Sequence, residues 1–196
     1  MARIEPIPYD ELPAPSKAII EEGLGNGMYT TPLPLQIVAY SSVALQAMHA
    51  QYEETFRKGV LDPRLVELMR LHSAEINACV PCGQSRKDDT ITEDDVACLI
   101  ELDPANFTTR EYRALRFFEM FANDHHSIDD DTFRWLAEVF TAAEIVEILY
   151  ACSTNLGGHR MMHALGVLEP TDPILTYSPA AVDAATATTT TTTTTV

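Results

Sequence analysis

The chain has 196 residues, enough for one domain with a substantial hydrophobic core and short for two. Its 29 acidic and 13 basic residues give a formal net charge of -16, which repels nucleic acids and anionic membranes, so we expect neither as a partner. The N-terminal stretch MARIEPIPYDELP lacks the apolar core of a signal peptide, and no apolar run approaches the ~20 residues that span a bilayer. We therefore expect a soluble, cytoplasmic protein.

The N-terminal part of the chain begins with a proline-rich stretch, residues 1–15, which we interpret as an extended arm. Ser16 is a candidate N-cap for a short helix that ends at the GLGNG run, residues 23–27. Because this run follows a helix rather than a strand, we expect a turn there and not a phosphate-binding loop. Apolar residues at helical spacing then predict one long helix over residues 34–58.

The remaining helices are predicted mainly from their N-terminal caps. An aspartate followed by proline, Asp62–Pro63, opens a helix that continues to the sequence EINA. Capping boxes predict three further helix starts, at Thr92 with Asp95, Thr108 with Glu111, and Thr141 with Glu144. The segment DDDTFRWLAEVF has acidic residues in its first turn, as the helix dipole favours.

These elements predict an all-α fold of about seven helices that occupies residues 16–170. We expect the last helix to be loosened at Gly157 and Gly158. His159 and His163, one helical turn apart, could form half a metal site, but surface or interface positions are the more ordinary interpretation. The low-complexity segment 171–196 has few large side chains to bury, so we expect it to be disordered and assign it no part in the fold.

The sequence EINACVPCGQSRK contains two of the four cysteines, Cys79 and Cys82, in a CxxC motif. In a reducing compartment such a pair is more often catalytic or metal-binding than a permanent structural disulfide. A helix break at 77–78 would place both cysteines near the start of a second helix, where free N–H groups favour a thiolate. Zinc requires four ligands, whereas Cys98 and Cys152 are isolated on apolar helix faces where we expect small core residues.

Charged residues on both sides of the cysteines are candidates for managing protons. Glu67 precedes Cys79 by twelve residues, about 18 Å along a straight helix, so it can reach the cysteines only if the second helix folds back. Arg86 follows Cys82 by four residues, and we expect it on the same face of the second helix. Its charge would lower a thiol pKa, but a guanidinium does not titrate in a useful range and cannot shuttle a proton.

The order Glu67, Cys79, Cys82 resembles the carboxymuconolactone decarboxylase superfamily, specifically its alkylhydroperoxidase AhpD-like branch. The pattern of that branch is Glu, eleven residues, CxxC, three residues and His, and Arg86 stands here in the place of the histidine. The resemblance covers residues 30–168 in helix order. It implies a helix-packed homo-oligomer, a trimer or hexamer, without cofactor or metal.

The same resemblance implies a thiol-dependent peroxidase or disulfide reductase. Cys82 would attack a hydroperoxide or another small-molecule substrate, Cys79 would resolve the product as a disulfide, and Glu67 would relay protons. A thioredoxin-like or dihydrolipoyl-type reductant would restore the dithiol. With Arg86 in the histidine position, His72 is the nearest candidate to replace the missing relay residue; packing at a helix contact is the alternative for His72.

Two other functions are compatible with the sequence. One is a decarboxylase-like lyase or hydrolase in which Arg86 binds the carboxylate of a small carboxylated or lactone substrate. The CxxC argues against this, because the cysteines are usually missing in the decarboxylase branch. The other is a non-catalytic helical oligomer that senses redox state through Cys79 and Cys82.

Overall fold

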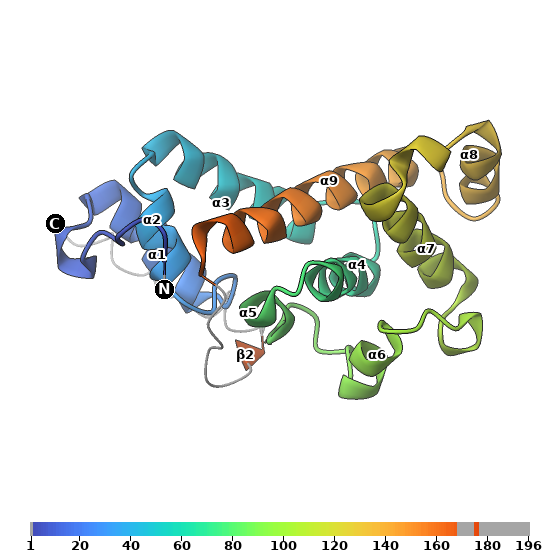
Figure 1. The fold of residues 1–196 in the computed structure, drawn as a ribbon, viewed down its shortest axis with the longest axis horizontal. Helices are drawn as coiled ribbons and strands as arrows, with labels where there is room; N and C mark the ends of the chain where they lie inside the picture. Colours follow the sequence, from blue (N-terminus) through green and yellow to red (C-terminus); the bar gives the residue numbers. More distant parts are fainter. Residues whose placement is uncertain (1, 168–174, 177–196) are drawn as a thin grey trace, which may run out of the picture.

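The computed structural model describes residues 2–167 and 175–176, and within them the fold is all-α, as predicted (Figure 1). Its nine α-helices are α1 (Ala14–Gly25), α2 (Leu33–Val38), α3 (Ser42–Arg57), α4 (Pro63–Ile76), α5 (Val80–Gly83), α6 (Glu93–Cys98), α7 (Thr109–Asn123), α8 (Asp130–Ala137) and α9 (Ala142–Leu165). Short 3-10 helices lie at Tyr9–Glu11, Pro104–Asn106 and His125–Ser127. Two-residue strands, β1 (Ser85–Arg86) and β2 (Leu175–Thr176), pair in parallel. Apart from β2, the predicted tail 171–196 lies outside the described residues.

The predicted N-terminal caps of the later helices are confirmed. Asp62 accepts a hydrogen bond from the Arg64 N–H at the start of α4. Complete capping boxes open α6, α7 and α9, because in each the threonine and the acidic residue three positions later satisfy each other's backbone N–H. At α8 the cap is Asp129, which forms a capping box with Thr132.

Three local predictions are wrong. Helix α1 begins at Ala14 with Pro13 as its cap, and Ser16 is a buried helical residue instead. The predicted helix 34–58 is two helices, since the chain turns after α2 and Ser41 caps α3 with its side chain. Helix α9 runs unbroken through residues 157–158, because each glycine costs only about 1 kcal/mol of helix propensity and the packing of α9 on α4 offsets that cost.

Helix α4 is the centre of the larger of two hydrophobic clusters, and every residue from Leu65 to Ala74 is buried. It packs against α7 and α9, and α8 packs against α9 (Figure 1). Phe117 and Phe118 of α7 are fully buried in this cluster, whereas Phe121 packs at its margin. Cys152 is buried there too, and burial raises the pKa of its thiol, as expected for a core cysteine; Cys98 is half-buried.

A second, smaller cluster joins α1, α2 and α3. Ile20, Leu35 and Leu45 are buried at its centre. This cluster lies at the end of the molecule where α1 and α2 cross beside α3 in Figure 1, and α3 extends from it to contact α4. The two clusters are thus separate bodies of apolar side chains, with α3 contributing to the smaller one and α9 to the larger.

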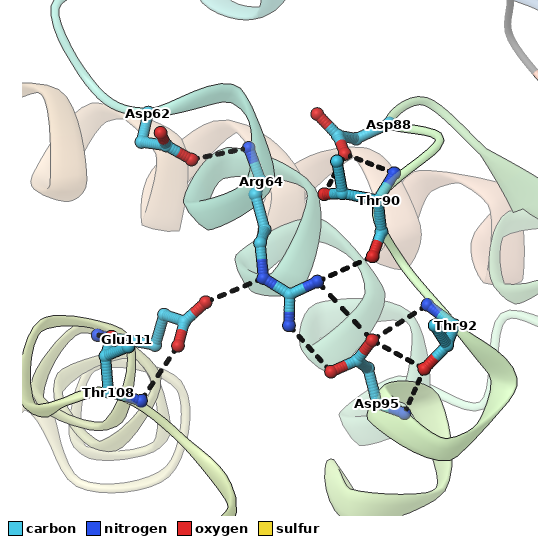
Figure 2. Close-up of polar contacts among 8 residues, drawn as sticks. All are labelled: Asp62, Arg64, Asp88, Thr90, Thr92, Asp95, Thr108 and Glu111. Atoms are coloured by element: carbon cyan, nitrogen blue, oxygen red, sulfur yellow. Dashed lines mark hydrogen bonds and ion pairs between the residues drawn. The ribbon is translucent and has the colours of Figure 1, made fainter.

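The first turn of α4 is tied to α6 and α7 by Arg64 (Figure 2). Its guanidinium forms ion pairs with Asp95 at 2.6 Å and with Glu111 at 2.9 Å, and donates to the Thr90 carbonyl at 2.8 Å. Hydrogen bonding to Arg64 lowers the pKa of Asp95 to about 2. Because Asp95 and Glu111 also belong to capping boxes, one side chain joins the N-terminal ends of three helices.

The N-terminal arm closes on the end of α9. The Arg3 backbone N–H donates to the Leu165 carbonyl at 2.8 Å, and the Arg3 guanidinium donates to the carbonyls of His163 and Ala164. These carbonyls lie in the last turn of α9, where helical carbonyls lack their usual partners, and that of His163 also accepts the Gly166 N–H at 3.0 Å. Arg3 therefore acts as a cap supplied from more than 150 residues away in the sequence.

Candidate active site

The chain reverses direction between α4 and the cysteines. Ala78 has a φ of 49°, in the left-handed region, and the Cys79 N–H donates to the Ala74 carbonyl at 2.9 Å. The helix break predicted at residues 77–78 is present, and the chain then returns alongside α4. The second helix, however, is only the four residues of α5, and the chain is already extended at β1.

Cys79 and Cys82 form a disulfide, with their Cα atoms 5.3 Å apart. Cys79 is the N-cap residue of α5 and is 1% exposed. Cys82 is half-buried and lines a cavity. The two sulfurs are therefore not equivalent: a molecule in the cavity meets Cys82, and Cys79 lies behind it.

Glu67 and Arg70 hold the segment after the cysteines in place. The Arg70 guanidinium forms two hydrogen bonds with the Glu67 carboxylate, both 2.7 Å long, and neither side chain is more than 3% exposed. Arg70 also donates to the Cys82 carbonyl at 2.6 Å and to the Ser85 carbonyl at 2.8 Å. Glu67 accepts the Lys87 backbone N–H at 2.8 Å. Glu67 is thus linked to the cysteine segment through its hydrogen bonds with Arg70 and with the Lys87 backbone.

We predicted Arg86 on the same helix face as Cys82, and this is wrong: Arg86 belongs to the strand β1. Its guanidinium is bound to both oxygens of the Glu93 carboxylate at 2.9 Å and donates to the carbonyls of Gly83 and Ser85. Arg86 is not among the residues that line the cavity. Arg86, which stands in the histidine position of the family pattern, is therefore bound by Glu93 and by backbone carbonyls.

The cavity has a volume of about 540 Å³ and lies between the smaller hydrophobic cluster and the cysteine segment. Helices α2, α3 and α9 supply much of its lining, and Cys82 lines it from the fold-back. Apolar side chains dominate the lining, including Leu35, Val38, Met48, Pro81, Met161 and Met162. The arrangement suits a ligand with an apolar body that presents one reactive group to Cys82.

The polar groups on the cavity wall come from parts of the chain that the sequence analysis did not link to the cysteines. His159 of α9 is 3% exposed, and its Nδ1 lies 2.9 Å from the Ser73 hydroxyl of α4. Burial, reinforced by the charge of Arg70, lowers the pKa of His159 to about 4, so this imidazole is neutral near pH 7. Its i,i+4 spacing with His163 was the signal in the sequence, but only the packing of α9 on α4 reveals its place.

Tyr29 and Lys87 complete this polar set. The Tyr29 hydroxyl is 3.1 Å from Nδ1 of His49, whose Nε2 lies 3.7 Å from a Glu22 carboxylate oxygen, and burial raises the pKa of Tyr29. The Lys87 amine donates to the carbonyls of Gly27 and Met28 at 2.6 and 2.7 Å. The expected turn is present only at the end of the GLGNG run, at Asn26 and Gly27, because residues 23–25 are the last residues of α1; Lys87 holds this turn at the cavity.

His72 lies elsewhere. It is 2% exposed between α4 and α7, with its ring 6.1 Å from that of Phe118 and its Nε2 3.8 Å from a Glu119 carboxylate oxygen. It does not line the cavity.

Within residues 2–167 and 175–176, no cluster of three or more His, Cys, Asp or Glu side chains could hold a metal ion, and no helix is long and apolar enough to cross a membrane.

Comparison with known proteins links this architecture to solved structures. No family model and no curated protein matches the sequence. The AhpD core of an uncharacterized peroxidase-related protein from Ralstonia eutropha JMP134 superposes with a TM-score of 0.72 at 17% identity, over 87% of this chain and 93% of the other. A peroxidase-related protein from Silicibacter sp. TM1040 gives 0.70 at 18% identity, over 88% of this chain and 93% of the other.

The debrominase Bmp8 also matches, in a cysteine-to-alanine variant in complex with 2,3,4-tribromopyrrole. Its TM-score is 0.68 at 14% identity, over 96% of this chain and 99% of the other. Similarity at this level of identity concerns the fold. The chain has the all-α fold of the AhpD core and of the peroxidase-related proteins, as its Glu–CxxC pattern predicted.

Proposed function

We propose that the chain is a thiol-dependent oxidoreductase that reduces organic hydroperoxides at Cys82. The observation that carries the proposal is the unequal placement of a bonded cysteine pair, with Cys82 on the wall of an apolar cavity and Cys79 buried behind it. Nucleophilic attack requires contact with the substrate, and resolution requires only contact with the partner sulfur.

In the proposed cycle the Cys82 thiolate attacks the terminal oxygen of the hydroperoxide. A sulfur–oxygen bond forms, the oxygen–oxygen bond breaks, and the alcohol leaves after protonation. The Cys79 sulfur then attacks the sulfenic acid, the disulfide forms, and water leaves. A dithiol reductant of the thioredoxin or dihydrolipoyl type restores both thiols by exchange.

The cavity lining favours a hydroperoxide with an apolar body over hydrogen peroxide. Side chains such as Leu35, Val38 and Met48 gain from burying hydrocarbon but offer no partner to a small polar molecule. We therefore expect cumene or fatty-acid hydroperoxides to react faster than hydrogen peroxide. Assembly into a homo-oligomer is part of the proposal, as the resemblance implies.

The test is peroxide consumption by the purified, reduced chain with dihydrolipoamide as electron donor. Cys82→Ser should abolish turnover, and Cys79→Ser should react once and accumulate a sulfenic acid detectable by dimedone. Cys98→Ser is the matched control, since this half-buried cysteine is free, and should retain wild-type turnover. Loss of two thiols without repeated turnover would favour the redox-sensing alternative instead.

Reductive debromination is a second candidate, favoured by the bromopyrrole complex among the structural neighbours. The cavity could admit a brominated aromatic ring, and Cys82 could take the bromine while Cys79 displaces bromide to give the same disulfide. The ring would take a proton. Bromide release from 2,3,4-tribromopyrrole in the same assay tests this candidate. The lyase alternative receives no such support, because Arg86 is bound to Glu93 and does not line the cavity.

A further inference from the structure

The side chains just after the CxxC motif alternate between lining the cavity and lying away from it. Ser85 and Lys87 line the cavity, and Arg86 between them does not. This alternation begins in the extended backbone of β1, in which successive side chains point to opposite faces, and Lys87 is the residue directly after that strand. In a helix, position 86 would share a face with Cys82; in an extended chain, position 87 takes its place at the cavity.

The amine of Lys87 is held in a way that suits both of its protonation states. Its two hydrogen bonds, to the carbonyls of Gly27 and Met28, use two N–H groups. A neutral amine has two N–H groups and one lone pair, and an ammonium group has a third N–H in place of the lone pair. The carbonyl pair can therefore hold the nitrogen fixed while a proton is gained or lost at the third position.

We propose that Lys87 is a catalytic residue that transfers the protons of the peroxide reaction, in the role that the resembled pattern gives to a histidine at position 86. This inference rests on the proposed function. The Lys87 ammonium donates its proton to the departing alkoxide as Cys82 forms its sulfenic acid. The neutral amine next takes the proton of the Cys79 thiol and passes it to the departing hydroxide, so that water leaves. After reduction it takes the proton of the Cys82 thiol, which restores the thiolate and the ammonium.

The surroundings of Lys87 support this role. Burial lowers the pKa of Lys87 to about 7, the charge of Arg70 acts in the same direction, and the charge of Glu67 opposes it. The amine therefore titrates in the physiological range, as a general acid should. His159 on the same cavity is neutral at that pH, and Tyr29 is a weaker acid than usual because burial raises its pKa.

The experiment compares two oxidants with different leaving groups. Cumene hydroperoxide expels an alkoxide, which needs a proton, whereas perbenzoic acid expels a carboxylate, which does not. Lys87→Arg retains a cation that can reach both carbonyls but cannot transfer a proton. We expect it to lower the rate constant for oxidation of the reduced chain by cumene hydroperoxide by about 10²-fold. We expect less than about a threefold loss with perbenzoic acid. Lys58→Arg, at an exposed lysine paired with Glu54, is the control.

Each outcome is decisive. An equal loss with both oxidants would mean that Lys87 supports the thiolate or the local fold, and would overturn the inference. An undiminished rate with cumene hydroperoxide would overturn it too. Thermal unfolding and alkylation of Cys82 by iodoacetamide establish that Lys87→Arg is folded with a reactive thiol. If the wild type reacts with neither oxidant, the proposed function fails, and this result differs from failure of the Lys87 role alone.

Discussion

Replacing Glu67 by glutamine should destabilise the fold far more than an ordinary loss of charge. The carboxylate accepts three hydrogen bonds, two from Arg70 and one from the Lys87 N–H. Glutamine keeps one acceptor oxygen but turns an NH₂ group toward a donor. Arg70, which is 2% exposed, then carries an uncompensated charge. Breaking a buried pair in this way costs about 3–5 kcal/mol of unfolding free energy.

The assay is urea unfolding of the oxidised chain at pH 7, followed by circular dichroism. Asp131→Asn is the matched control: Asp131 and Arg134 have the same acid-to-arginine spacing of three residues, but both are exposed, so we expect a cost of at most about 1 kcal/mol. The double variant Glu67→Leu/Arg70→Met leaves no unpaired charge but removes the partners of the Cys82 carbonyl and the Lys87 N–H, so we expect it to recover at most about 2 kcal/mol relative to Glu67→Gln.

One result would refute this reasoning. If Glu67→Gln lowered the unfolding free energy by less than about 1 kcal/mol and yet reduced peroxide turnover by about 10²-fold, Glu67 would be a proton relay and not an anchor for Arg70. The ratio of the two effects therefore distinguishes the role implied by the family pattern from the role indicated by the contacts.

Three further outcomes test other parts of the structure. Arg86→Gln should change the alkylation rate of reduced Cys82 by less than about threefold, because Arg86 is bound outside the cavity; a tenfold change would contradict this placement. His159 has a folded pKa of about 4 against about 6.5 when unfolded, so its contribution to stability is complete above pH 6.5 and is lost as pH falls toward 4. Lowering the pH from 7 to 4.5 should therefore reduce the unfolding free energy of His159→Asn by about 2–3 kcal/mol less than that of the wild type. Urea titrations that gave equal reductions for both chains would contradict this assignment. Arg64→Met should cost about 1–3 kcal/mol at pH 7 and progressively less as pH falls from about 4 through 2, because Asp95 takes up its proton in that range; a cost independent of pH would exclude Asp95 as the main partner (Figure 2).

The sequence predicted best what is determined locally. A capping box such as Thr108 with Glu111 is complete within four residues, so its sequence pattern suffices. The helix predicted over 34–58 failed because the apolar spacing continues across a turn that Ser41 caps. Arg86 was misplaced because a helix was extrapolated beyond α5, where pairing with β2 and the contacts of Arg70 favour an extended chain.

The composition of the candidate site could be predicted only in part. Cys79, Cys82 and Glu67 stand in one short pattern; the fold-back after α4 joins the two cysteines, and Arg70 links the Cys82 carbonyl to Glu67. His159 reaches the cavity through the packing of α9 on α4, and no local feature of the sequence encodes that packing. The role of Arg70 was missed as well, since only burial distinguishes it from any other helical arginine.

The contacts of Arg3 have a practical consequence for anyone preparing this protein. The helix that carries His159 ends in carbonyls that the arm satisfies from the other end of the chain. A shortened expression version starting at Ala14, or a bulky fusion that displaces the arm, would free the last turn of α9 to fray. An expression version should therefore retain Arg3 and the segment that joins it to α1.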